Sequence, residues 1–175
     1  MNDRLGLSFS GTGSSVLPFI CGVIGVVVAN VPISFLGGLV PSPLLAFMPV
    51  YFWCLVRPDL MSAPAALALG ALEDLLSGGP MGIWALSFVV AYTLVDRERD
   101  GFAGLSGIGA IFGFAAAMLV AEVTAFLVVA ATHATFPPLG PFVLQAVTTI
   151  LLYFPGLALL TQVHHRFVGA LRSDF

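Results

Sequence analysis

The sequence contains no lysine, and charged residues make up only 9% of its 175 positions. Its six arginines stand singly or in one close pair, so they form no basic patch of the kind that nucleic acid requires. The formal net charge of -3 likewise gives no support to a polyanionic partner. We therefore exclude nucleic-acid binding.

The sequence also has little that could carry catalysis or hold a cofactor. It contains no His-Glu-x-x-His motif, no phosphate-binding glycine loop and no Gly-x-Ser-x-Gly motif. The acid pair Glu73 and Asp74 is adjacent, so the two side chains diverge by about 100° on a helix. Cys21 and Cys54 stand isolated in apolar runs, without the spacing of a metal or redox site. We predict no enzyme activity, no cofactor and no metal.

Apolar residues are what the chain has in abundance. Hydrophobic residues account for 59% of the chain and the mean hydropathy is +1.06, too apolar for a water-soluble domain of this size. At about 20 residues per crossing, the chain has room for six spans and short loops. We predict an all-α integral membrane protein with a single membrane domain over residues 1–175 and six transmembrane helices, at about 16–36, 43–56, 62–76, 81–95, 105–131 and 141–163.

The arginines predict the orientation of these spans. With both termini in the cytoplasm every arginine lies on the cytoplasmic side, as the positive-inside rule favours; these are Arg4, Arg57, Arg97, Arg99, Arg166 and Arg172. Tyr51, Phe52 and Trp53 precede Arg57 as an interfacial aromatic belt would. Spans two and three are short, so a re-entrant pair remains an alternative, although it would place Arg57 in hydrocarbon.

The stretch from Arg57 to Leu86 places charges at both ends of a predicted helical hairpin. Arg57 and Asp59 fall at the cytoplasmic interface, with Asp59 or Ser62 as the N-cap of the third span. Gly70 and Asp74 share one helical stripe with Ala66. A carboxylate near a helix C-terminus opposes the macrodipole and needs a partner. We expect Asp74 to accept hydrogen bonds from free backbone N–H groups of Ser77 to Gly82, a turn that includes Gly78, Pro80 and the start of the fourth span.

The fifth predicted span carries a ladder of small residues and one acid. Small residues recur every fourth position, which favours close helix packing in lipid; they are Gly109, Gly113, Ala117, Ala121 and Ala125. Whether the neighbouring helix belongs to this chain or to a partner is left open. Glu122 lies in the outer half of this span and could form an outer polar cluster with Glu73, Asp74 and His133. Such a cluster could be a proton or cation site or a docking point for a partner helix, or Glu122 could simply join the helices.

The segment from Gly70 to Leu86, preceded by a short aromatic span and Arg57-Pro58, resembles the rod shape-determining protein MreD family. The matching family segment reads approximately Gly-x-x-x-Asp-x-x-x-Gly-x-Pro-Leu-Gly, and Met81 stands here in place of the leucine. The similarity extends to chain length, six spans and a cytoplasmic N-terminus. Glu73 is a local variation to which we transfer no family role.

The resemblance implies a non-enzymatic scaffold in the bacterial inner membrane. Such proteins pair with the bitopic protein MreC, and through it with the MreB filament, RodA-type glycosyltransferases and class B penicillin-binding proteins. The resemblance also implies a fold similar to the substrate-binding subunits of energy-coupling-factor transporters. The alternative function is a small-molecule uptake subunit in which Glu73, Asp74 and Glu122 face an outward polar cavity. Few aromatic and hydrogen-bonding groups converge on the outer loops, which argues against such a pocket.

Overall fold

The computed structural model describes residues 12–31, 41–99, 101, 108–134 and 136–168, and the described residues form helices and no strands. Six α-helices are followed by a single π-helical turn. They are α1 (Thr12–Ala29), α2 (Phe47–Val56), α3 (Ala63–Ser77), α4 (Ile83–Arg97), α6 (Ile108–His133) and α7 (Leu139–Val163), with η2 (His164–Val168) at the end of α7. The predicted all-α class is confirmed for this part of the chain.

Each predicted span overlaps one helix, with shifts at the ends. The first helix ends at Ala29, earlier than the predicted residue 36; Asn30 and Val31 are not helical, and residues 32–36 lie outside the described ranges. The second begins at Phe47 and not at residue 43. By length and apolar composition, Gly109–His133 and Leu139–Phe167 could cross a membrane, whereas Val16–Ala29 and α2 are apolar but shorter. The six-span topology therefore stays a prediction.

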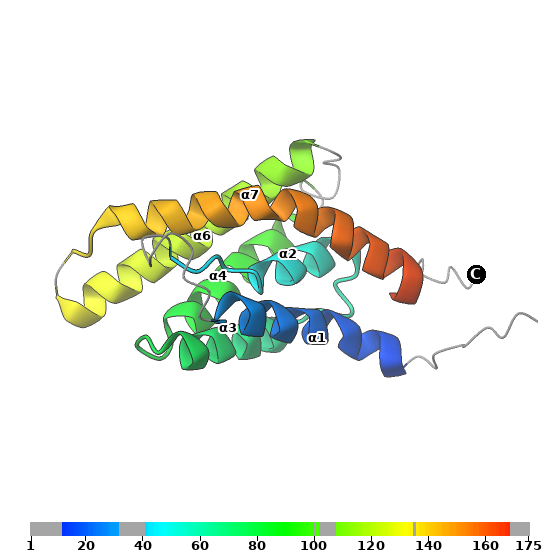
Figure 1. The fold of residues 1–175 in the computed structure, drawn as a ribbon, viewed down its shortest axis with the longest axis horizontal. Coiled ribbons are helices and arrows are strands. Elements are labelled where there is room, and N and C mark those ends of the chain that lie inside the picture. Colours follow the sequence, from blue (N-terminus) through cyan, green and yellow to red (C-terminus); the bar gives the residue numbers. More distant parts are fainter. Residues whose placement is uncertain (1–11, 32–40, 100, 102–107, 135, 169–175) are drawn as a thin grey trace, which may run out of the picture.

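Helix α2 lies at the centre of the bundle. It contacts α1, α4, α6 and α7, and eight of its ten residues are buried. Figure 1 shows α6 and α7 as an antiparallel pair on one side of α2 and α1 and α3 on the other, while α4 packs against both α3 and α6. The start of α1 and the end of α7 lie at the same end of the molecule, whereas the α3–α4 and α6–α7 turns lie at the opposite end (Figure 1).

Aromatic rings from four helices build the core around α2. Phe114 of α6 stacks on Tyr153 of α7, with centroids 3.8 Å apart and planes 8° from parallel. The ring of Tyr51 of α2 is T-shaped to both, with centroid distances of 5.4 and 5.9 Å. The expected interfacial belt is therefore wrong, because Tyr51, Phe52 and Trp53 are all buried inside the protein. A short helix that is apolar on every side is best stabilised at a bundle centre.

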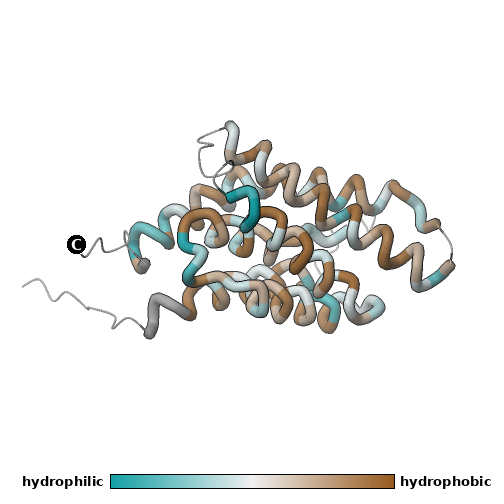
Figure 2. Tube along the Cα trace, turned by 180° about the vertical axis from the view of Figure 1, so that it is seen from behind, coloured by the Kyte–Doolittle hydropathy of each residue, from teal (hydrophilic) through white to brown (hydrophobic). Residues whose placement is uncertain are grey.

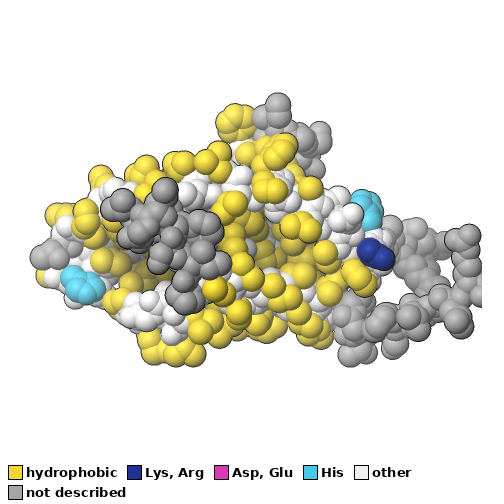
Figure 3. Space-filling model, in the orientation of Figure 1, with side chains coloured by type: hydrophobic (Ala, Val, Ile, Leu, Met, Phe, Trp, Pro, Cys, Tyr) yellow, Lys and Arg dark blue, Asp and Glu magenta, His cyan; other side chains and the backbone are white. Residues whose placement is uncertain are grey.

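The outer surface is mostly apolar. Figure 2 shows hydrophobic residues along most of the helix lengths, and Figure 3 shows a face covered by hydrophobic side chains with few charges. On α6 the exposed side chains include Phe112 at 70% and Leu127 at 59%. Contiguous apolar surface of this extent is costly in water and is what a helix bundle presents to lipid.

The small residues of α6 face inward. Ala117, Ala121 and Ala125 are fully buried, Gly113 is buried and Gly109 is half-buried. Within the described residues α6 packs mainly on α4 and α7. The ladder therefore has its neighbours within this chain, and a partner helix would have to use another face of α6.

Candidate functional site

The α3–α4 turn is built from two glycines and one buried carboxylate. Helix α3 ends at Gly78, whose φ of +68° is left-handed, and α4 starts after Gly82, whose φ is +102°. Glycine adopts these angles without the steric cost that a Cβ would bring. Gly82 has no side chain with which to cap α4, so the first N–H groups of that helix need an acceptor from elsewhere.

Asp74 supplies that acceptor from one turn before the end of α3. Its Oδ2 accepts from the N–H of Gly82 at 2.9 Å and of Ala85 at 3.1 Å, and its Oδ1 accepts from the N–H of Trp84 at 2.8 Å. The side chain is only 2% exposed. An anion at a helix N-terminus is favoured by both the free donors and the helix dipole.

This geometry confirms the expected type of partner for Asp74 and refines its position. One donor, Gly82, lies within the predicted turn, while the other two lie in the first turn of α4. Pro80 lies exposed in the turn and has no N–H to donate. Asp74 therefore acts as a remote N-cap that joins α3 to α4.

Gly70 brings the backbones of the same two helices together. A Cβ placed on Gly70 would lie 2.7 Å from the Cα of Ala85 and closer still to the carbonyl oxygen of Trp84. Backbone atoms cannot rotate away as a flexible side chain can, so any larger residue would push α3 and α4 apart. Gly70 and Asp74 thus act on the same segment of α4, one by close approach and one by hydrogen bonding.

Glu73 faces α1 and not the turn. Its Oε1 accepts a 2.9 Å hydrogen bond from the side-chain amide of Asn30, which also donates to the carbonyl of Val26. Glu73 is 3% exposed, and its Oε2 has no partner among the described residues. Sequence reasoning missed Asn30, because nothing local to either residue indicates a contact across 43 positions. The available signal was an isolated amide at the end of an apolar run.

Glu122 of α6 is buried without a hydrogen bond. It is 5% exposed, and neither carboxylate oxygen has a partner in the described part of the chain. His133 lies eleven residues further along, about 16 Å by helical rise. Its exposed ring bonds to Thr132 and Val129 of its own turn. Between the described residues no hydrogen bond joins Glu73, Asp74, Glu122 and His133, so His133 does not connect them into one cluster.

Arg57 and Asp59 form a separate pair in the α2–α3 connection. Arg57 donates from Nε and a terminal nitrogen to the two carboxylate oxygens of Asp59, at 2.9 and 2.8 Å. These hydrogen bonds lower the pKa of Asp59 and raise that of Arg57. Ser62, and not Asp59, occupies the N-cap position of α3, and its side chain makes no capping bond. The hydroxyl of Tyr92 donates to the carbonyl of Met61 at 2.8 Å and fixes this connection to α4.

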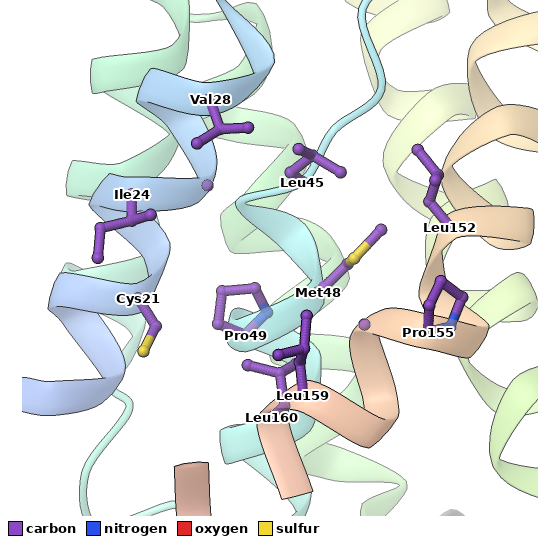
Figure 4. A pocket seen from close by; sticks show the side chains of 12 residues that line it. Cys21, Ile24, Val28, Leu45, Met48, Pro49, Leu152, Pro155, Leu159 and Leu160 are labelled. Atoms are coloured by element: carbon purple, nitrogen blue, oxygen red, sulfur yellow. The ribbon is translucent and has the colours of Figure 1, made fainter. Parts of the chain in front are cut away.

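An apolar groove of about 330 Å³ lies between α1, α2 and α7, and we call it the α1–α2–α7 groove (Figure 4). It is lined by Cys21, Ile24, Gly25, Val28, Leu45, Met48, Pro49, Leu152, Pro155, Gly156, Leu159 and Leu160. None of the three buried acids Glu73, Asp74 and Glu122 lines it. Among the described residues no three His, Cys, Asp or Glu side chains come together as a metal site requires. The geometry thus offers structural joints and an apolar surface.

Comparison with known proteins identifies the family. Residues 11–163 match the family model described as rod shape-determining protein MreD. No curated protein and no solved structure matches the chain. Since the family match covers most of the sequence, the chain belongs to the MreD family, and its role is in determining rod shape.

Proposed function

We propose that this member of the MreD family is a non-enzymatic scaffold subunit of the bacterial cell-elongation complex, which organises peptidoglycan synthesis. The family match over residues 11–163 carries the proposal. The structure supports it, because two of the three buried acids among the described residues serve helix joints: Asp74 caps α4 and Glu73 bonds to Asn30. A scaffold needs rigid helices more than it needs a reactive cleft.

The partner we propose is an MreC-like bitopic protein, whose single span would contact this chain in the membrane. Through it the chain would connect to an MreB filament, a RodA-type glycosyltransferase and a class B penicillin-binding protein. The small-residue ladder of α6 is buried and so unavailable to that span. The exposed apolar side of α6, which includes Phe112, Leu119, Val123 and Leu127, is available.

We further propose six spans in the inner membrane with both termini in the cytoplasm, in a fold similar to the substrate-binding subunits of energy-coupling-factor transporters. The common position of the α1 start and the α7 end supports an even number of crossings (Figure 1). In a variant whose native cysteines are replaced by alanine, a cysteine at Thr135 should react with a membrane-impermeant thiol reagent in intact cells. A cysteine at Glu98 should react only after the cells are opened. The reverse pattern would overturn this topology.

Depletion and co-purification test the scaffold function. Cells depleted of the protein should become round, and the tagged full-length chain should co-purify with the MreC-like protein from detergent extracts. Depleted cells that stay rod-shaped and grow normally would contradict the proposal.

The alternative of a small-molecule uptake subunit gains no support from the described cavity, which is apolar and lacks the three acids. A ligand-dependent rise in melting temperature that disappears in Asp74→Ala would favour uptake over scaffolding.

A further inference from the structure

The α1–α2–α7 groove runs along the last half of α7. Leu152 and Leu160 line it eight residues apart, about 12 Å by helical rise. Two of its lining positions are glycines, and Gly156 is one at which a Cβ would lie 2.9 Å from the sulfur of Met48. Its volume of about 330 Å³ lies within the range of pockets that hold small ligands. The α1–α2–α7 groove is therefore an elongated apolar depression on the lipid-facing surface of a membrane protein.

His164, His165 and Arg166 follow the groove at the end of α7, and Arg166 is the permanently charged residue among them. Gly156 and Leu160 line the groove, and His164 follows at the next interval of four, so it lies one turn beyond the lining on the same helical face. At His164 the helix changes to the π-helical turn η2, a form that is often found at functional sites. Figure 3 shows a histidine and a basic side chain next to each other at this end of α7.

The contacts of His164 tie this end of α7 to α2. Its ring lies 6.1 Å from the ring of Phe52 and 5.8 Å from that of His165. Burial and the neighbouring His165 and Arg57 lower the pKa of His164, so its ring is neutral at pH 7 and offers an N–H donor without a charge. The Nδ1 of His164 is buried and has no hydrogen-bond partner in the described residues. Arg57 uses two of its five guanidinium N–H donors to bind Asp59, so three donors of Arg57 are left for another anion.

We propose that the α1–α2–α7 groove binds one anionic phospholipid of the cytoplasmic leaflet. One acyl chain lies in the groove, and the headgroup phosphate lies against His164, His165, Arg166 and the free donors of Arg57. Charge complementarity selects this occupant: an apolar groove that ends beside Arg166 and the remaining donors of Arg57 matches an acyl chain with an anionic headgroup, whereas a hydrophobic helix requires no such charges. The inference rests on the membrane orientation proposed above.

Native mass spectrometry of the full-length chain in detergent tests the proposal. The protein is mixed with dioleoyl phosphatidylglycerol or dioleoyl phosphatidylcholine, which share acyl chains and differ in headgroup charge. We expect one tightly retained phosphatidylglycerol and weaker retention of phosphatidylcholine. Replacement of Arg166 by Gln should reduce phosphatidylglycerol retention about fivefold, the effect of one charge near a membrane surface, and should leave phosphatidylcholine unchanged. Arg99→Gln, in the α4–α6 connection, is the matched control.

A second pair of variants tests the acyl chain separately. Ile24 and Ile20 lie one turn apart on α1 and are 56% and 46% exposed, but only Ile24 lines the groove. Ile24→Trp should fill the groove and reduce the retention of both lipids, while Ile20→Trp should not. Equal retention of the two lipids by the native chain, equal effects of the two tryptophans, or a second copy of the chain bound in place of lipid would overturn the proposal. Each of these outcomes is independent of the cell-shape phenotype that tests the scaffold function.

Discussion

Replacement of Asp74 by alanine removes the acceptor for three backbone N–H groups at the start of α4. Gly82 and Trp84 are half-buried, whereas Ala85 is buried and loses its acceptor without access to water. A buried donor left without a partner costs about 1–3 kcal/mol, and the loss of an ordinary N-cap costs about 1 kcal/mol. Because the donors share one acceptor, their costs do not add fully. We expect Asp74→Ala to lower the free energy of unfolding by about 3 kcal/mol.

Asp74→Asn provides a graded comparison. The amide oxygen can still accept from Gly82 and Ala85 in place of Oδ2, but the amide nitrogen would then face the N–H of Trp84, donor against donor. We expect a loss of about half that of the alanine variant, since two of the three hydrogen bonds persist. Asp59→Ala is the matched control, because the Asp59 side chain is 50% exposed and surface ion pairs contribute less than about 1 kcal/mol.

The measurement is equilibrium unfolding in mixed micelles of dodecyl maltoside and SDS, followed by far-ultraviolet circular dichroism. Hydrogen exchange of the peptide that contains Trp84 and Ala85 reports the local effect, and exchange there should accelerate before global unfolding. An Asp74→Ala protein within 0.5 kcal/mol of wild type, or unchanged exchange at these two amides, would show that the carboxylate does not cap α4.

Three further predictions concern other joints of the bundle. Gly70→Ala should lower the free energy of unfolding by about 1–3 kcal/mol in the same assay, because its Cβ would press on the backbone of α4. Gly140→Ala, which has open space around it, should lower it far less. Equal losses in the two variants would contradict the close approach of α3 and α4. Asn30→Ala should lower the free energy of unfolding by about 1–3 kcal/mol, because it leaves Glu73 without its hydrogen bond. Asn30→Asp should lower it more, because it brings two acids together. An Asn30→Ala protein as stable as wild type would show that this bond is not needed. The Arg57–Asp59 pair should stabilise the fold only above the lowered pKa of Asp59. The stability difference between wild type and Asp59→Asn should therefore vanish as the pH falls through that pKa, and it should shrink in high salt. A difference that persists in acid would exclude the ion pair as its source.

The helix pattern and the Asp74 joint were accessible from the sequence because both depend on neighbouring residues. The run Gly78-Gly79-Pro80, which follows Asp74 within eight positions, ends α3. The first N–H groups of the next helix are then left without partners. The nearest carboxylate in the chain is then Asp74. The Asn30–Glu73 bond was not accessible in this way, because it joins two helices whose relative rotation is set by packing alone.

The position of α2 shows why short apolar segments mislead. Aromatic residues just before an arginine have the same sequence pattern whether they lie at a lipid interface or in a protein core. An apolar surface on every side fits a lipid environment as well as a protein core, and it is the packing of α1, α4, α6 and α7 around α2 that places Phe47 to Cys54 in the core. The apolar run before Arg57 therefore identified the helix without locating it in the bundle.

Loss of the hydrogen bonds of the two buried acids of α3, Asp74 and Glu73, should have different consequences for the bundle. All three donors to Asp74 lie in one short segment, so its loss should loosen one hairpin. Glu73 joins α3 to the end of α1, which itself forms one wall of the α1–α2–α7 groove. A change at Asn30 should consequently alter both the stability of the bundle and the retention of lipid in the groove, whereas a change at Asp74 should alter stability alone. Measuring both quantities in both variants separates the joint that supports the groove from the joint that does not.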